Sequence, residues 1–103
     1  MLTITLSPVV SQMFAVQLEG VSCTIKLHQR TTGLYMDLWA NGVLVFAGVL
    51  CLNITKLIRY AYIRAESGIK GELFFADMNG TNDPEYSELG TRYKLFYLTS
   101  SEL

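Results

Sequence analysis

The chain is poor in the residues that carry most enzyme chemistry. Its 103 residues include one histidine and two cysteines, and only 17% of them are charged. A nucleophile needs a base within hydrogen-bonding reach, normally a histidine or a buried carboxylate, and His28 is the only histidine. The sequence has no Gly-x-Ser-x-Gly elbow, no Cys-x-x-Cys pair and no phosphate-binding glycine-rich loop. We therefore expect no catalytic residues, no cofactor and no enzymatic activity.

Metal ligands are equally scarce. One histidine and two cysteines do not make a structural zinc set. Asp83, Glu85 and Glu88 lie close together in a late polar stretch and are candidates for holding a hard cation, but calcium sites usually need more oxygen ligands at tighter spacing. We interpret these carboxylates as part of a solvated loop, and His28 as an exposed residue at the end of a strand.

The chain also lacks a long apolar run and an export signal. Its longest apolar run, residues 43–52, falls short of the roughly 18–20 residues that cross a membrane. No basic residue precedes Lys26, and polar residues interrupt the apolar residues near the start of the sequence. We therefore expect that the chain has no signal peptide and is made in the cytosol. Cys23 and Cys51 are then expected to be reduced and to pack as small buried hydrophobes.

What the chain does have is apolar surface. Half of its residues are hydrophobic, the mean hydropathy is +0.30 and the formal net charge is -1. A small domain has little interior, so some of these side chains are expected on the surface, where large apolar patches mark interfaces with partners. A charge near zero favours association and argues against nucleic-acid binding, which normally needs an excess of Lys and Arg.

Short segments of alternating apolar and polar residues recur along the whole chain, separated by turn signals. This pattern is typical of a β-sandwich or β-barrel, so we predict one all-β domain over residues 1–103 with at most one short helix. The predicted strands are residues 2–6, 13–19, 21–28, 34–40, 43–49, 73–78 and 93–98.

Two turns predict hairpins, and two segments leave alternatives open. Glu19-Gly20 and Asn41-Gly42 each join two predicted strands, and Asn-Gly favours the positive φ angles of a type I′ turn. The strand at 43–49 is apolar on both faces, so it is either central or lies against a partner. Residues 53–63 fit either a short helix or an irregular crossing segment.

Two groups of residues are candidates for a protein interface. Tyr35 and Trp39 share one face of a strand, and such side chains combine apolar area with a polar tip that suits interfaces, although core or rim packing accounts for most aromatic residues. Leu2, Ile4 and Leu6 form a short, terminal, strongly β-patterned strand that a neighbouring subunit is able to pair with.

The order of several motifs resembles the baseplate plug family of contractile-tailed bacteriophages, of the cyanophage type. The resemblance spans about residues 2–98. It rests on Ile4-x-Leu6-Ser7-Pro8-Val9 before Gln12-x-Phe14, on Leu34-Tyr35-Met36-Asp37-Leu38 leading through Asn41-Gly42, on Asp83-Pro84-x-Tyr86-x-x-Leu89-Gly90-Thr91 before Tyr93-x-Leu95-x-Tyr97, and more loosely on Leu57-x-x-Tyr60.

The resemblance implies a structural protein of the virion, made in the host bacterial cytoplasm and assembled into the tail baseplate. Such proteins act as a plug or hub adaptor among hub, spike and tube components, in an oligomeric assembly without nucleic acid or membrane. This chain departs from the family pattern at Val10-Ser11 and over residues 62–71, which puts partner contacts at 62–71 in doubt. The alternative hypothesis, based on the aromatic content, is a β-barrel that binds a small ligand or carbohydrate.

Overall fold

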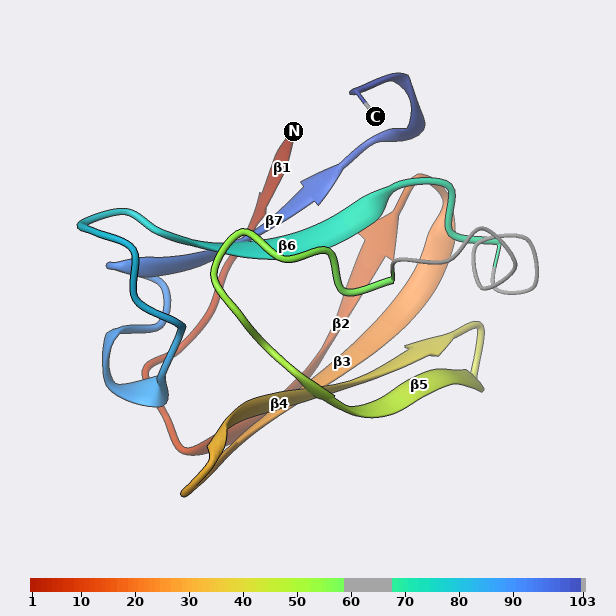
Figure 1. The fold of residues 1–103 in the computed structure, drawn as a ribbon. Coiled ribbons are helices and arrows are strands. Elements are labelled where there is room, and N and C mark those ends of the chain that lie inside the picture. Colours follow the sequence, from red (N-terminus) through yellow and green to blue (C-terminus); the bar gives the residue numbers. More distant parts are fainter. Residues whose placement is uncertain (59–67, 103) are drawn as a thin grey trace.

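The described part of the chain folds into seven antiparallel strands. The computed structural model describes residues 1–58 and 68–102, and this part of the chain contains no α-helix, only two short 3-10 turns (Figure 1). The all-β prediction is therefore confirmed. The elements are β1 (Leu2–Ile4), β2 (Ser11–Leu18), β3 (Val21–Arg30), β4 (Gly33–Ala40), β5 (Val43–Leu50), β6 (Glu72–Asp77), η1 (Tyr86–Glu88), β7 (Tyr93–Leu98) and η2 (Ser100–Glu102).

The strands form two sheets that face each other, so the fold is a sandwich. One sheet has the order β1-β7-β6 and the other the order β2-β3-β4-β5 (Figure 1). The first sheet joins the two ends of the chain, since Leu2 pairs with Tyr97 and Ile4 with Leu95. The chain termini consequently lie near each other (Figure 1).

Both predicted hairpin turns have the expected backbone. Glu19 and Gly20 have φ angles of 49° and 83°, and Asn41 and Gly42 have φ angles of 51° and 81°. Two successive positive φ angles define the type I′ turn, whose twist matches that of the strands it joins. These turns fix the register of β2 on β3 and of β4 on β5.

The core lies between the sheets and follows the period of two that the sequence shows. Because side chains alternate across a strand, every second residue of β3 and β4 points inward. The fully buried residues of β3 and β4 are Cys23, Ile25, Leu27, Leu34, Met36 and Leu38, and they share one core with Leu73, Phe75, Leu95 and Tyr97 of the other sheet. Cys51 is also buried, and neither cysteine is in a disulfide. Both therefore pack as small buried hydrophobic side chains, as predicted.

Most predicted strand bounds shift by one or two residues, and the placements of β5, β1 and β6 need correction. β5 is not central, because it lies at the edge of its sheet and pairs only with β4. β1 ends at Ile4 rather than at Leu6. β6 begins one residue earlier than predicted, at Glu72, which is fully buried; its carboxylate accepts the N–H groups of Ile58 and Leu73 at 2.8 and 2.9 Å.

The ambiguous segment at 53–63 is irregular where the structure describes it. Over residues 53–58 it runs along β6, with the Ile54 N–H donating to Phe75 O and the Leu57 N–H to Leu73 O. Residues 59–63, including Tyr60, lie outside the described part, and so does most of the 62–71 stretch. Residues 53–58 are therefore an irregular segment beside β6, and the choice between helix and crossing segment over the rest of 53–63 lies outside the described residues.

Candidate protein interface

Tyr35 lies on the outer face of the four-stranded sheet and is half-buried by its neighbours. Its ring stacks on that of His28, with 5.9 Å between centroids, and the Arg30 guanidinium lies 5.8 Å from its centroid. Its hydroxyl is 2.7 Å from the Thr32 hydroxyl. Tyr35 thus contacts His28, Arg30 and Thr32 of its own sheet and turn, and it stays partly exposed beside the exposed Arg30.

Trp39 lies on the same outer face, directly opposite Thr24 of β3 and Leu44 of β5. It is half-buried, whereas Leu44 is 52% exposed. Asp37 separates Trp39 from Tyr35 along β4, and it accepts the Gly48 N–H at 2.7 Å where the register of β5 shifts. Tyr35 and Trp39 therefore do not form one aromatic cluster, because each packs against its own cross-strand neighbours.

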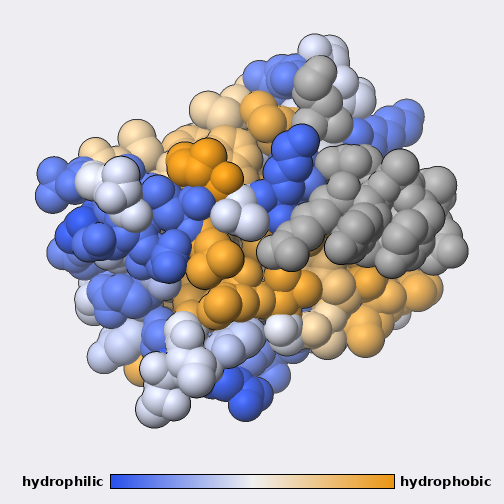
Figure 2. All heavy atoms as spheres, viewed as in Figure 1, coloured by the Kyte–Doolittle hydropathy of each residue, from blue (hydrophilic) through white to orange (hydrophobic). Residues whose placement is uncertain are grey.

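β5 is the most exposed apolar element of the described chain. It is eight residues long, has no charged residue and no proline, and carries Val43 at 69% exposure beside Leu44. Apolar side chains gather on the face of the molecule where the four-stranded sheet lies (Figure 2). Edge strands usually carry charge, proline or bulges that block pairing with another chain. β5 has only the irregularity near Gly48. Its sequence, apolar on both faces, predicted a central strand or one that lies against a partner; since β5 is an edge strand, the partner remains a prediction.

The N-terminal candidates divide between core and surface. Ile4 and Leu6 are buried in the core, while Leu2 at the start of β1 is 42% exposed. β1 pairs with β7 of the same chain, so one of its edges is already occupied. An interface made by Leu2, Ile4 and Leu6 remains a prediction, and it involves the other edge of β1.

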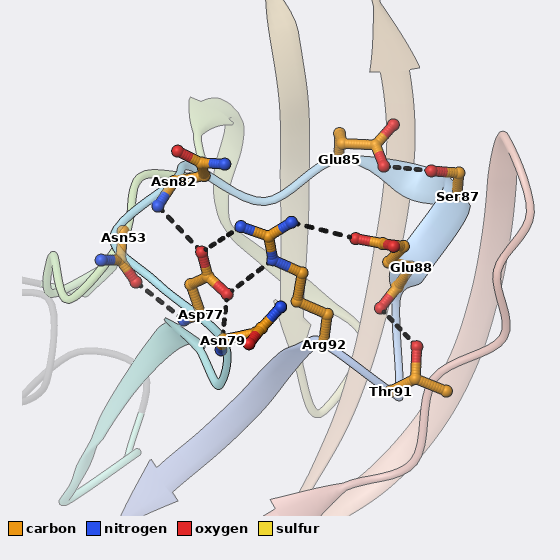
Figure 3. Close-up of polar contacts among 9 residues, drawn as sticks. All are labelled: Asn53, Asp77, Asn79, Asn82, Glu85, Ser87, Glu88, Thr91 and Arg92. Atoms are coloured by element: carbon orange, nitrogen blue, oxygen red, sulfur yellow. Dashed lines mark hydrogen bonds and ion pairs between the residues drawn. The ribbon is translucent and has the colours of Figure 1, made fainter.

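The late polar loop is a network of satisfied groups (Figure 3). Asp77 forms a two-point ion pair with Arg92, at 2.8 and 2.9 Å, and accepts the N–H groups of Asn79 and Asn82. The Asn53 side chain in turn accepts the Asp77 N–H. Arg92 beside Asp77 holds the pKa of that carboxyl well below its usual range. This network ties the crossing segment to the start and end of the loop.

The three carboxylates considered for a cation each have another role. Asp83 accepts the Asn53 N–H at 2.9 Å. Glu85 is paired with the Ser87 hydroxyl, and the Glu88 carboxylate lies 3.5 Å from the Arg92 guanidinium (Figure 3). They do not converge, and residues 1–58 and 68–102 contain no cluster of three potential metal ligands. The solvated-loop interpretation accounts for them.

Asp77→Asn is expected to destabilise the loop network. The substitution replaces one carboxylate oxygen with an N–H₂ group that faces the donors of Arg92 and Asn82. We expect the melting temperature at pH 7 to fall by roughly 5–10 °C. Because the folded carboxyl has a lowered pKa, its stabilisation is present above the unfolded pKa of about 3.9 and is lost as pH falls below it.

Thermal unfolding followed by circular dichroism at pH 7 and at pH 3 measures this effect. The gap between wild type and variant should narrow at the lower pH. Asp83→Asn is the matched control, because Asp83 makes one hydrogen bond and no ion pair among the described contacts. Equal effects of the two substitutions would contradict the role given to Asp77.

His28 is more buried than expected. Its ring is covered by Tyr35, and its Nδ1 atom is buried without a hydrogen-bond partner in the described part of the chain. The expectation of an exposed strand residue is therefore wrong, because cross-strand stacking with an aromatic neighbour covers a ring even on an outer face. No hydroxyl or thiol is hydrogen-bonded to this ring among the described residues, so the pairing of nucleophile and base is not present there.

None of the helical segments described here has the length and apolar character that membrane crossing requires.

The two cysteines are buried thiols, and their burial argues against reactivity. Burial raises the pKa of Cys51 to about 12 and also raises the pKa of Cys23, which keeps both in the less nucleophilic thiol form. The distinctive features of the described surface are thus its apolar strand edges.

Comparison with known proteins agrees with this picture. The sequence matches the family described as cyanophage baseplate Pam3 plug gp18 over residues 1–100, which is nearly the whole chain. No curated protein sequence is similar enough to give a match. The resemblance first seen in the order of the motifs is confirmed by the family match. With seven strands in two sheets and a match of this length, the chain belongs to the cyanophage baseplate plug family.

Proposed function

We propose that the chain acts as a plug or hub adaptor at the tip of the tail tube, held there by contacts with hub, spike and tube proteins in an oligomeric assembly. The observation that carries this proposal is the family match, because membership implies a structural role in the tail baseplate of the virion. The chain would be made in the bacterial cytoplasm, act without catalysis or cofactor, and bind neither nucleic acid nor membrane.

The exposed edges support a role in assembly. β1, β2 and β5 each pair on one side only within the described residues. An unpaired strand edge presents N–H and C=O groups that a neighbouring chain is able to bind. The apolar β5 edge and the formal charge of -1 suit a subunit that is covered once and stays in place.

The small-ligand barrel has no comparable support. A binding barrel encloses its ligand within a closed sheet. The described strands form two separate sheets instead, and none of the described pairings joins one sheet to the other. Most of the aromatic side chains that suggested a ligand are at least half-buried in these sheets.

Cryo-electron microscopy of purified tails tests the proposal directly. We expect density that fits this sandwich at the tip of the tail tube, in contact with the hub or spike. A map of intact tails without this chain at the tip would remove the proposal. Deleting the gene should give particles that lack this density, which controls for the assignment of a small β-domain.

Leu44→Lys is expected to impair assembly while leaving the fold intact. Leu44 is exposed on the outer face of an edge strand, so lysine is tolerated in the free protein, but a subunit covering β5 would have to bury its charge. We expect incorporation into tails to fall by about tenfold or more. Thr81→Lys, at an exposed position in the late loop away from the strand edges, is the control. Equal incorporation of both variants, with unchanged melting temperatures, would exclude β5 as a contact.

A further inference from the structure

The sandwich is open along one side, where β1 of one sheet and β2 of the other border a groove of about 350 Å³. Residues 2–5 line one wall and residues 14–16 the other. β1 pairs only with β7 and β2 only with β3, so in the described chain each has one strand edge without a partner strand. The groove therefore combines apolar side chains with two unpaired strand edges.

Side chains that point into the sandwich are left partly uncovered at this groove. Phe14 pairs with Ile25 and Val16 with Cys23, and directly paired residues share a face of the sheet. Ile25 and Cys23 are fully buried, but Phe14 and Val16 are only half-buried. β2 lies at the edge of its sheet, whereas β3 has a neighbouring strand on each side. An added strand would cover the exposed parts of both side chains.

One end of the groove is already bridged by an amide. The Gln12 side chain donates from Nε2 to Ser7 O at 2.7 Å and accepts the Ser7 N–H on Oε1 at 3.2 Å. A carboxamide presents the same donor and acceptor as a peptide group, and this reciprocal pair is what two antiparallel strands exchange. Gln12 thus supplies one peptide-like group between β2 and the segment that follows β1. Beyond it, none of the described hydrogen bonds joins β1 to β2.

We propose that an extended, uncharged segment of a neighbouring baseplate protein lies in this groove and pairs with the free edge of β1. The proposal rests on the proposed function and specifies one contact within it. A strand continues the hydrogen bonding that Gln12 begins, because its peptide groups recur at the spacing of the strand edges. None of the lining residues is charged, so a charged side chain entering the groove would lose its hydration without gaining a partner.

The size of the groove favours a segment of another protein over a second copy bound alone. A segment matching residues 2–5 has about four or five residues and buries well under the roughly 1,200 Å² of a stable isolated interface. Such a contact holds only when other contacts of the same assembly support it. β1 is a fixed platform for it, because the Met1 ammonium binds Glu102 and the strand pairs with β7.

Site-specific photo-crosslinking in purified, intact tails tests this contact. A photoreactive amino acid replaces Thr5 or Ala15, which are exposed and line opposite walls of the groove. Thr81, exposed in the late loop, is the control position. We expect the first two positions to crosslink, about tenfold more than the third, to the same uncharged extended segment of another tail protein, identified by mass spectrometry of the linked peptides.

The other possible results of the crosslinking experiment distinguish the groove contact, its occupant and the proposed function. Tails that contain the chain but give no crosslink at Thr5 and Ala15 would overturn the groove contact while leaving the proposed function intact. A link to a second copy, or to a charged or helical segment, would overturn the stated occupant. Absence of the chain from the tails would overturn the proposed function itself. As a second measurement, Thr5→Lys should reduce incorporation about tenfold relative to Thr81→Lys, with equal melting temperatures of the free proteins.

Discussion

Gly71→Ala is expected to lower the free energy of unfolding by about 3 kcal/mol or more, a large part of the total for a domain of this size. An added Cβ would lie 1.9 Å from the Leu98 carbonyl oxygen and 2.5 Å from Cζ of Tyr97. The carbonyl belongs to the backbone of β7, where Leu98 pairs with Glu72. The clash is therefore relieved only by separating β6 from β7 or by displacing the buried Tyr97 ring.

Urea unfolding followed by fluorescence measures this loss. Gly20→Ala is the matched control, because a Cβ at Gly20 meets nothing within 4 Å although its φ angle is +83°. That variant should lose only the roughly 1–2 kcal/mol of a left-handed alanine. If Gly71→Ala were as stable as the wild type, the close packing of residue 71 against β7 would have to be incorrect.

Local pattern was enough to predict most of the strands. Apolar and polar residues alternate along β3 and β4, and the apolar face of each strand has to be the face that packs into the core. The alternation therefore determines which side chains point inward. Asn41-Gly42 predicted a hairpin because few other residue pairs adopt two positive φ angles. These features depend on residues that are near each other in sequence, so they are visible without the structure.

Pairing between distant segments could not be predicted in this way. Nothing in residues 2–6 specifies β7 as the partner of β1, since many strands offer a similar apolar face. The ion pair of Asp77 with Arg92 depends on how the late loop folds back. The buried carboxylate of Glu72 departs from the usual exposure of glutamate, and the N–H groups that it accepts belong to Leu73 and to the distant Ile58, which the sequence does not place beside it.

The candidate interface shows the same division. Tyr35 and Trp39 were correctly assigned to one face of a strand, because that assignment follows from a period of two. The core positions of Ile4 and Leu6 were not foreseen, since an apolar strand at a terminus fits a core as well as an interface. The groove between β1 and β2 arises only when the two sheets are assembled, so no sequence motif indicates it.

A second buried contact connects three distant parts of the chain through Tyr97. Its hydroxyl donates to the Glu19 carboxylate at 2.7 Å and accepts the Gly71 N–H at 2.9 Å. Glu19 also accepts the N–H and hydroxyl of Ser100. The hydrogen bond from Tyr97 is the main reason that the pKa of Glu19 is lowered. The Tyr97 hydroxyl, through these hydrogen bonds, thus connects the β2–β3 turn, the residue before β6 and the C-terminal segment.

Tyr97→Phe is expected to cost about 2 kcal/mol at pH 7, because it removes a buried donor to a carboxylate and an acceptor of the Gly71 N–H while keeping the ring. Burial and the Glu19 charge raise the pKa of the folded phenol, so its contribution is complete below the unfolded pKa of about 10 and declines as pH rises further.

The stability gap between wild type and Tyr97→Phe should therefore shrink above pH 10. Cys23 and Cys51 also have raised pKa values, but they are present in both proteins and cancel in the comparison. Urea unfolding of both proteins at pH 7, 9 and 11 provides the measurement, with Tyr86→Phe as a control at a tyrosine that lies outside this hydrogen-bonded group. A gap that is absent at pH 7, or one that widens at alkaline pH, would show that the Tyr97 hydroxyl does not join these three segments in solution.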